Sequence, residues 1–460
     1  MYTFANISKS VFGKAQSATP SQPTEVTLTI TLEHFDNPSL PKTFATGDEI
    51  GGYVSMGMPE TTEFDAVSIT LEGSRSKTNS RLTGTVTTFV RPPLLSPGGN
   101  NRDHKNSQTF LTLKEPVDRW ELRRINTNAI GWFYQIPFRF EVPPDQRKSR
   151  EWQAHLRESV RHAQLKIPPS HEKNSVPSTA PNIASISYCI KAKLLKYGPQ
   201  DGPENPLGET SRVIRIVPVI TEEPPLPICS TLGKESIAAA TAYLEGNAWT
   251  GSQGRMEMEV AQPKSLCVPV STGYDTWQKE SVETRAEMKL RFEPIEVSGM
   301  PPKLTRITAK LRAATRVSSA SMSDCPYRIG TRADGTNDGL SVETIPLVGG
   351  TVQEVKWHRD LTGHKRDAMS SDQAGGRRHL TTVLPLRLVL PLQKQYLPTF
   401  HSSLISHFYV VVLVLSFRMH GDSISPKKES MRLEVPIQVS SELFVNRDSH
   451  FSDDSDGEGE

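Results

Sequence analysis

The sequence predicts an all-β protein built from two antiparallel β-sandwiches in tandem. Of its 460 residues, 35 are proline and 30 are glycine; hydrophobic and polar residues alternate in many short segments, and one segment has helical spacing. A proline content above the usual ~5% suits short strands and turns, and it disfavours a helical bundle. With 36% hydrophobic and 23% charged residues, the composition excludes collagen, a coiled coil and wholesale disorder.

The first predicted strand, Val26–Leu32, carries a hydrophobic residue at every second position, with threonines between them. A period of two is typical of a strand with one buried face. The same pattern predicts strands at 50–56, 66–73, 84–90, 109–113, 132–142, 185–195 and 213–220. Residues 91–107 combine turn formers with charge, and we expect a long exposed loop there.

The segment from Asp145 to Lys166 interrupts the strand pattern. Trp152, Leu156 and Val160 recur every four positions, which predicts a short amphipathic helix that ends before Pro168. Basic residues cluster in this region and are candidate contacts for anions or a membrane: Arg147, Lys148, Arg150, Arg157 and Arg161. Such clusters hold phosphates or anionic lipid head groups, and the alternative is an ordinary solvated face.

Residues 221–236 are rich in proline and have no periodicity, which indicates a domain boundary. Beyond it, strands are predicted at 255–260, 286–292, 303–315, 351–357, 380–392, 407–417 and 431–439, with a basic insertion at 356–378. The predicted organisation is a flexible N-terminus (1–22), a first sandwich (23–220), a hinge (221–236), a second sandwich (237–445) and an acidic disordered tail (446–460). In this tail, Ser455 precedes acidic residues and is a candidate phosphorylation site.

The sequence lacks the usual signatures of catalysis. It contains no GxSxG, no phosphate-binding P-loop, no GxGxxG at a strand–helix turn and no HExxH. The four cysteines are too far apart for a CxxC metal motif: Cys189, Cys229, Cys267 and Cys325. The histidine pairs have no suitably spaced partner ligands. We therefore expect a protein that is not an enzyme and that has no metal and no other cofactor.

Charge and hydropathy indicate where such a protein would act. The 53 basic and 51 acidic residues give a net charge of +2, and no aromatic stacking surface accompanies the basic residues, so nucleic acid is not an expected partner. The N-terminal segment has no apolar stretch of the signal-peptide kind. No stretch approaches the ~18 apolar residues of a membrane span. We expect a cytoplasmic protein.

Three segments in order carry a family resemblance: WFYQIPFRFEVPP at 132–144, LKIPPS at 165–170 and ISYCIKAKLL at 186–195. Together they resemble the N-terminal half of fungal arrestin-like proteins, the arrestin-related trafficking adaptor family. In the second half, PPKLTRITAKLRAAT at 301–315 and LPTFHSSLISHFYVVVLVLSF at 397–417 are also similar to that family.

The resemblance implies two arrestin-type, immunoglobulin-like sandwiches and a non-enzymatic cytosolic adaptor. Such adaptors bind the cytosolic tails of membrane transporters or receptors and link them to ubiquitylation, endocytosis or sorting. Anionic phospholipids and a ubiquitin ligase are further expected partners, with peripheral association with the plasma membrane or endosomes. Members that recruit ligases with WW domains carry PPxY motifs, whereas every Pro-Pro pair here is followed by other residues.

Two alternatives to this adaptor remain open. One is a sorting-coat component similar to the arrestin-fold subunit of retromer, which would act through stable protein partners without a ubiquitin ligase. The other is a hydrolase on a β-sandwich scaffold, which would need a deep pocket and a nucleophile–base pair.

Overall fold

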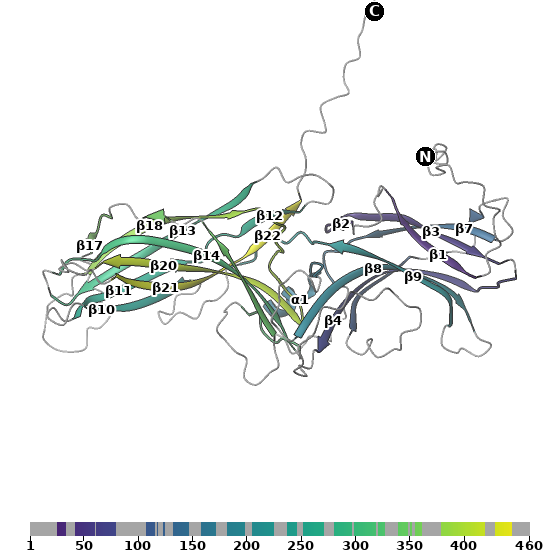
Figure 1. Ribbon diagram of the computed structural model, residues 1–460, viewed down its shortest axis with the longest axis horizontal. Helices are drawn as coiled ribbons and strands as arrows, with labels where there is room; N and C mark the ends of the chain where they lie inside the picture. Colours follow the sequence, from purple (N-terminus) through teal and green to yellow (C-terminus); the bar gives the residue numbers. More distant parts are fainter. Residues whose placement is uncertain are drawn as a thin grey trace, which may run out of the picture.

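The computed structural model shows a chain of strands with a single short helix among the residues that it describes. These are residues 25–33, 42–59, 61–79, 107–115, 117, 123–124, 132–146, 158–171, 182–197, 205–224, 237–245, 252–270, 280–296, 299–318, 321–326, 339–347, 350–351, 355–360, 379–418 and 428–443. They form strands β1–β22 and one helix, α1 (Glu158–Leu165). The predicted all-β class, with one short helix, is confirmed. Figure 1 shows an elongated molecule with β1–β9 towards one end and β10–β22 towards the other.

The strands before residue 217 form two sheets. One sheet has the order β1 (Thr27–Leu32), β3 (Glu49–Met58), β7 (Trp132–Glu141), β6 (Arg123–Arg124). The other has the order β2 (Thr43–Phe44), β9 (Asn205–Ile216), β8 (Asn182–Lys196), β4 (Ala66–Asn79), β5 (Ser107–Glu115). All of these pairs are antiparallel except β2 with β9.

The later strands form three sheets. The first has the order β10 (Ile237–Glu245), β11 (Ser252–Ala261), β13 (Ser281–Pro294), β18 (His379–Pro391), β17 (His358–Asp360). The second has the order β15 (Gly339–Pro346), β14 (Lys303–Val317), β20 (Ile405–Arg418), β19 (Phe400–His401), with β16 (Gly350–Thr351) on β14 and β21 (Lys428–Ile437) on β20. The third is the parallel pair of β12 (Leu266–Val270) and β22 (Val439–Leu443).

Side-chain alternation explains how these strands bury a core. In β13, every second residue from Val282 to Phe292 is buried, and the residues between them are mostly charged and exposed. The most apolar strand, β20, is buried on both faces over most of its length. Its odd-numbered residues, such as Tyr409, face the main core of this half, whereas Phe408 and Val410 pack with Ala314 in a separate cluster. A strand covered on both faces has to be apolar throughout.

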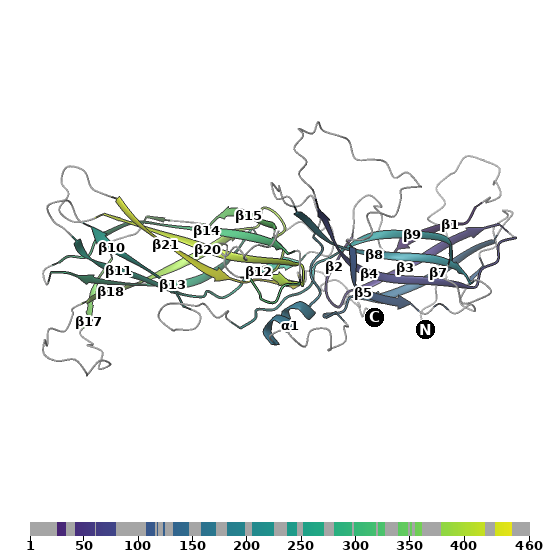
Figure 2. The same ribbon diagram turned by 90° about the horizontal axis from the view of Figure 1, so that it is seen from below.

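Most of the buried apolar residues fall into two large clusters. One contains residues of β10–β14, β18, β20 and β21, and the other contains residues of β1–β5 and β7–β9. The second cluster also includes Val317, Phe400 and Ile405, from the ends of β14, β19 and β20. These strand ends therefore reach the core formed by the earlier strands. Figure 2 shows α1 beside this junction.

Several details differ from the sequence analysis. The strand predicted at 213–220 begins at Asn205 and ends at Ile216, and residues 355–357 are not part of a strand. Strands β2, β6, β10, β12, β15, β17 and β19 were not predicted, and β17 lies within the predicted insertion at 356–378. The predicted strand at 84–90, most of the loop at 91–107, the N-terminal residues 1–22, residues 225–236 of the hinge and the acidic tail lie outside the described residues.

Candidate functional site

The first candidate surface is the outer edge of β10. Within the described part of the chain, β10 pairs with β11 on one side, and no strand pairs with its other edge. From Ile237 to Tyr243 it carries no charged residue and no proline. Natural sheets usually protect their edges with charges, prolines, bulges or very short strands, since an open edge is a template for another strand.

Several other edge strands in the described part of the chain show such protection. β21 carries Lys428, Glu429, Arg432, Glu434 and Pro436, and β2, β6 and β17 have only two or three residues. β1 is uncharged, but the Arg212 guanidinium donates a hydrogen bond of 3.0 Å to the Ile30 carbonyl oxygen. β5 (Ser107–Glu115), an edge strand of the other half of the chain, is likewise free of charge and proline from Ser107 to Leu113. Among the long edge strands described in its own half, β10 is the one that lacks such protection.

From Ala238 to Ala242, the side chains of β10 that meet the core are small, whereas Leu244 beyond them is a large side chain buried in the same core. Ala238 is buried, Ala240 and Ala242 are partly buried against the main core, and Tyr243 points outward with 72% of its surface exposed. An added strand would place every second side chain beside these alanines. Because the alanines leave room at the rim of the core, the surface suits an extended segment with apolar residues at alternate positions.

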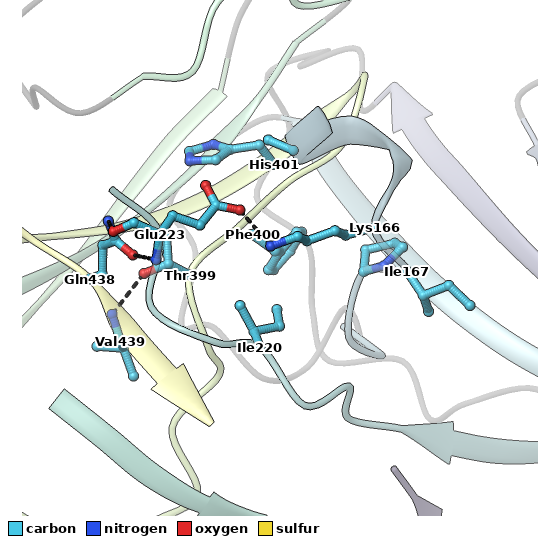
Figure 3. Close-up of a pocket in the computed structure, with 11 residues that line it drawn as sticks. Lys166, Ile167, Ile220, Glu223, Thr399, Phe400, His401, Gln438 and Val439 are labelled. Atoms are coloured by element: carbon cyan, nitrogen blue, oxygen red, sulfur yellow. Dashed lines mark hydrogen bonds and ion pairs between the residues drawn. The ribbon is translucent and has the colours of Figure 1, made fainter. Parts of the chain in front are cut away.

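The second candidate is a small cavity of about 40 Å³ at the junction between the two groups of strands. Figure 3 shows its lining, with Lys166, Glu223 and His401 among the polar side chains. The Lys166 ammonium donates a hydrogen bond of 2.5 Å to the Glu223 carboxylate, and the two form an ion pair. A cavity of this size holds a few water molecules and no larger ligand.

Polar side chains of the last strands hold the segment from Pro218 to Pro224 at this junction. The Gln438 amide accepts the Glu223 N–H at 2.8 Å and donates to the Glu223 carbonyl oxygen at 3.0 Å. The Ser441 hydroxyl accepts the Ile220 N–H and donates to the Pro218 carbonyl oxygen, both at 2.8 Å. These bonds take the place of strand pairing for this segment.

Ser441→Ala is expected to lower the free energy of unfolding by about 2 kcal/mol, because it leaves a buried N–H and a buried carbonyl without partners. Urea unfolding followed by tryptophan fluorescence measures the change. Glu442→Ala, an exposed position on the same strand, is the matched control and should stay within about 0.5 kcal/mol of the wild type. Equal losses in the two variants would contradict the assigned role of the Ser441 hydroxyl.

Three histidines lie at or beside the junction. Burial lowers the pKa of His401 to about 4, although Glu223 and Asp324 oppose the shift. Burial lowers the pKa of His407 to about 3, and His171, His401 and Lys394 lower it further. Burial also lowers the pKa of His171. These rings are therefore neutral near pH 7, and His407 Nδ1 is hydrogen-bonded to the Thr315 hydroxyl at 2.8 Å.

The junction contains a serine–histidine pair that the hydrolase alternative would require. His401 Nδ1 is hydrogen-bonded to the Ser406 hydroxyl. Ser406, however, is fully buried, and the adjacent cavity is too small for a substrate. A working nucleophile needs an exposed position and a site for the reacting carbonyl. This pair is suited to holding β19 against β20 rather than to hydrolysis.

Most of the site residues predicted from sequence lie outside the described residues: Arg147, Lys148, Arg150, Arg157 and Ser455. Arg161 lies on α1 and is partly exposed, and nearby Val160 is buried as the helical spacing predicts. In the described part of the chain, no group of three His, Cys, Asp or Glu side chains is arranged to hold a metal ion. Cys189, Cys267 and Cys325 form no disulfide within the described residues.

The sequence analysis predicted neither the open edge of β10 nor the cavity at the junction. The run of alanines in β10 has no clear period of two, and the polar residues of the junction come from positions more than two hundred residues apart.

No helix in the described ranges is long and apolar enough to cross a bilayer. Comparison with known proteins finds no family model and no curated protein that matches this chain.

Proposed function

We propose that this protein is a non-enzymatic adaptor of the arrestin-like kind, which binds an extended segment of the cytosolic tail of a membrane transporter or receptor. The observation that carries the proposal is the unprotected edge of β10 from Ile237 to Tyr243. Edge strands of this kind accept a peptide by strand addition, in which backbone hydrogen bonds give affinity and side-chain pockets give specificity. The resemblance of segments in both halves of the chain to arrestin-like proteins supplies the class of ligand.

The geometry of the edge defines the peptide. Seven residues of β-strand span about 24 Å, and in an antiparallel pairing every second residue directs both its N–H and its C=O outward. The peptide would therefore need several consecutive residues in extended conformation and free of proline. Coupling of the bound cargo to ubiquitylation or sorting would follow from other partners, which the resemblance implies.

Thr241→Lys is expected to weaken peptide binding at least tenfold, because a lysine on the exposed face of an edge strand disfavours pairing with another strand. The probes are overlapping peptides that tile the cytosolic tails of plasma-membrane transporters, and the peptides that bind are titrated by fluorescence anisotropy. Thr241→Val keeps the size of the side chain and its preference for a strand, so it should bind as the wild type does.

A second arm tests strand addition itself. N-methylation removes a backbone N–H donor. In an antiparallel pairing, only every second residue of the peptide directs its N–H to β10. N-methyl groups on those residues should therefore abolish binding, whereas N-methyl groups on the residues between them should spare it. If both methylated series bind equally, or if Thr241→Lys binds as tightly as Thr241→Val, the peptide does not pair with β10.

A further inference from the structure

The open edge of β10 has nearly the same pattern of side-chain size in both directions. From Ile237 to Tyr243 its sequence is IAAATAY, with a large side chain at each end and five small ones between them. Two antiparallel copies of this strand can pair about a twofold axis through Ala240, which places Ile237 opposite Tyr243 of the second copy and Ala238 opposite Ala242. In this register large side chains meet large ones, small meet small, and all seven uncharged residues take part.

Tyr243 is the side chain of this edge that gains most contact from a second copy. With 72% of its surface exposed, it is the most exposed large hydrophobic side chain in the described part of the chain. On one side it lies opposite Arg255 of β11. A second copy would place Ile237 on its other side, and the twofold axis would form this contact twice. Covering an exposed aromatic ring with an apolar side chain is favourable.

The charges near this edge do not oppose such a pairing. In the same sheet the nearest described ones lie one strand back, on β11, at Arg255, Glu257 and Glu259. Across the seven residues, therefore, no two charges come directly opposite each other, and the like-charge repulsion that keeps many sheet edges apart does not arise. Figures 1 and 2 show β21 beside β10, and there the exposed Arg432 forms an ion pair with Glu434 at 2.6 Å.

From this symmetry we infer that, when no cargo peptide is bound, the open edge of β10 pairs with β10 of a second copy of this chain. The two five-stranded sheets then join into one continuous sheet, and the contact closes as a twofold dimer. Self-pairing also covers an edge that is otherwise a template for aggregation. The inference rests on the proposed function for the peptide that competes for this edge, because one edge pairs with one strand at a time.

The dimer should be weak enough to release its edge to a peptide. The alanines at the rim of the core, Ala238, Ala240 and Ala242, would meet only alanines of the second copy. They would fill little of the room that larger apolar residues of a cargo peptide can fill. A single pair of seven-residue strands also buries less than the ~1,200 Å² of a small stable interface. We therefore expect a dissociation constant of about 10–100 μM for the dimer.

Sedimentation velocity of the full chain over a series of concentrations tests the inference. We expect a monomer–dimer equilibrium. Thr241→Lys, which places a lysine opposite Ala239 of the second copy twice in each dimer, should weaken association at least about tenfold. Thr241→Val should associate as the wild type does, since its side chain has a similar size and suits a strand. A chain that stays monomeric throughout, or species larger than a dimer, as head-to-tail pairing of β10 with β5 would give, overturns the inference.

Cross-linking tests the register. Because Ala240 lies opposite itself in the dimer, Ala240→Cys should bring two thiols within reach of a disulfide. Ala242→Cys is the matched control: Ala242 is also partly buried on the same face of β10, but its two copies would lie about 13 Å apart along the strands. Under mild oxidation Ala240→Cys should form covalent dimers well above the background of the wild type with its four cysteines, and Ala242→Cys should not. Equal cross-linking of the two variants overturns the inference.

Peptide competition separates this inference from the proposed function. A peptide that binds the chain in the anisotropy assay should convert the dimer to a monomer, and a dimer that persists at saturating peptide overturns the inference. If peptides bind a chain that is monomeric at every concentration, the inference fails and the proposed function stands. If the chain dimerises in the stated register but no peptide binds, the proposed function fails and the dimer stands.

Discussion

Acidification from pH 7 to pH 4 is expected to lower the free energy of unfolding by about 3 kcal/mol through His407 alone. Burial lowers the pKa of this ring to about 3 in the folded chain. The unfolded chain binds a proton on the ring below about pH 6.5, while the folded chain does not until about pH 3. Stability is therefore fully present above pH 6.5 and is lost progressively as the pH falls towards 3. His401 acts in the same direction.

Urea unfolding at a series of pH values measures this effect, and His407→Gln isolates it from the titration of carboxylates. The variant should be less stable near pH 7, because it loses the ring contacts with Phe400 and Tyr409. Between pH 6.5 and pH 4, the free energy of unfolding of the variant should fall less steeply than that of the wild type, and the two slopes should differ by about 1.4 kcal/mol per pH unit. Parallel slopes for His407→Gln and the wild type would show that this ring does not govern acid stability.

Gly52→Ala is expected to lower the free energy of unfolding by about 3 kcal/mol. Gly52 lies in β3 between Leu32 of β1 and Phe138 of β7. An added Cβ atom would lie 2.3 Å from the Thr31 carbonyl oxygen and 2.6 Å from the Phe138 ring. The carbonyl belongs to a paired strand, so the clash can be relieved only by moving β1 away from β3.

The neighbouring glycine is the matched control for this prediction. A Cβ atom at Gly51 would meet the end of the Glu33 side chain, which can rotate away. Gly51→Ala should therefore change stability by no more than about 0.5 kcal/mol. Thermal and urea unfolding of the two variants under the same conditions provide the comparison. Similar losses at both positions would show that the approach of the Thr31 carbonyl is not the limiting contact.

Local pattern was sufficient to predict the strands whose side chains alternate clearly. β13 and β4 were recognised because hydrophobic and polar residues follow each other at a period of two. β10 was missed because its alanines are small on both faces, and a run of alanines shows no preference for one face of a strand. Its pairing with β11 holds it in the sheet in spite of its weak local preference.

The candidate sites depended much less on local pattern. The sequence drew attention to basic residues near the predicted helix, whereas the structure brings Lys303 and Arg418 opposite each other where the ends of β14 and β20 meet. Lys303 and Arg418 are 115 positions apart in the chain, and only the register of the two strands makes them neighbours. Likewise, Gln438 and Glu223 lie 215 positions apart.

By itself, the sequence determined that this is a protein of antiparallel strands with one short helix, because the period of side-chain exposure is a property of each strand alone. Only the tertiary structure decided which strand has an open edge, which histidines are buried at the junction and which basic residues lie opposite each other at the ends of strands. Those features arise from contacts between distant segments, and the free energy of such contacts depends on the register and packing of whole sheets.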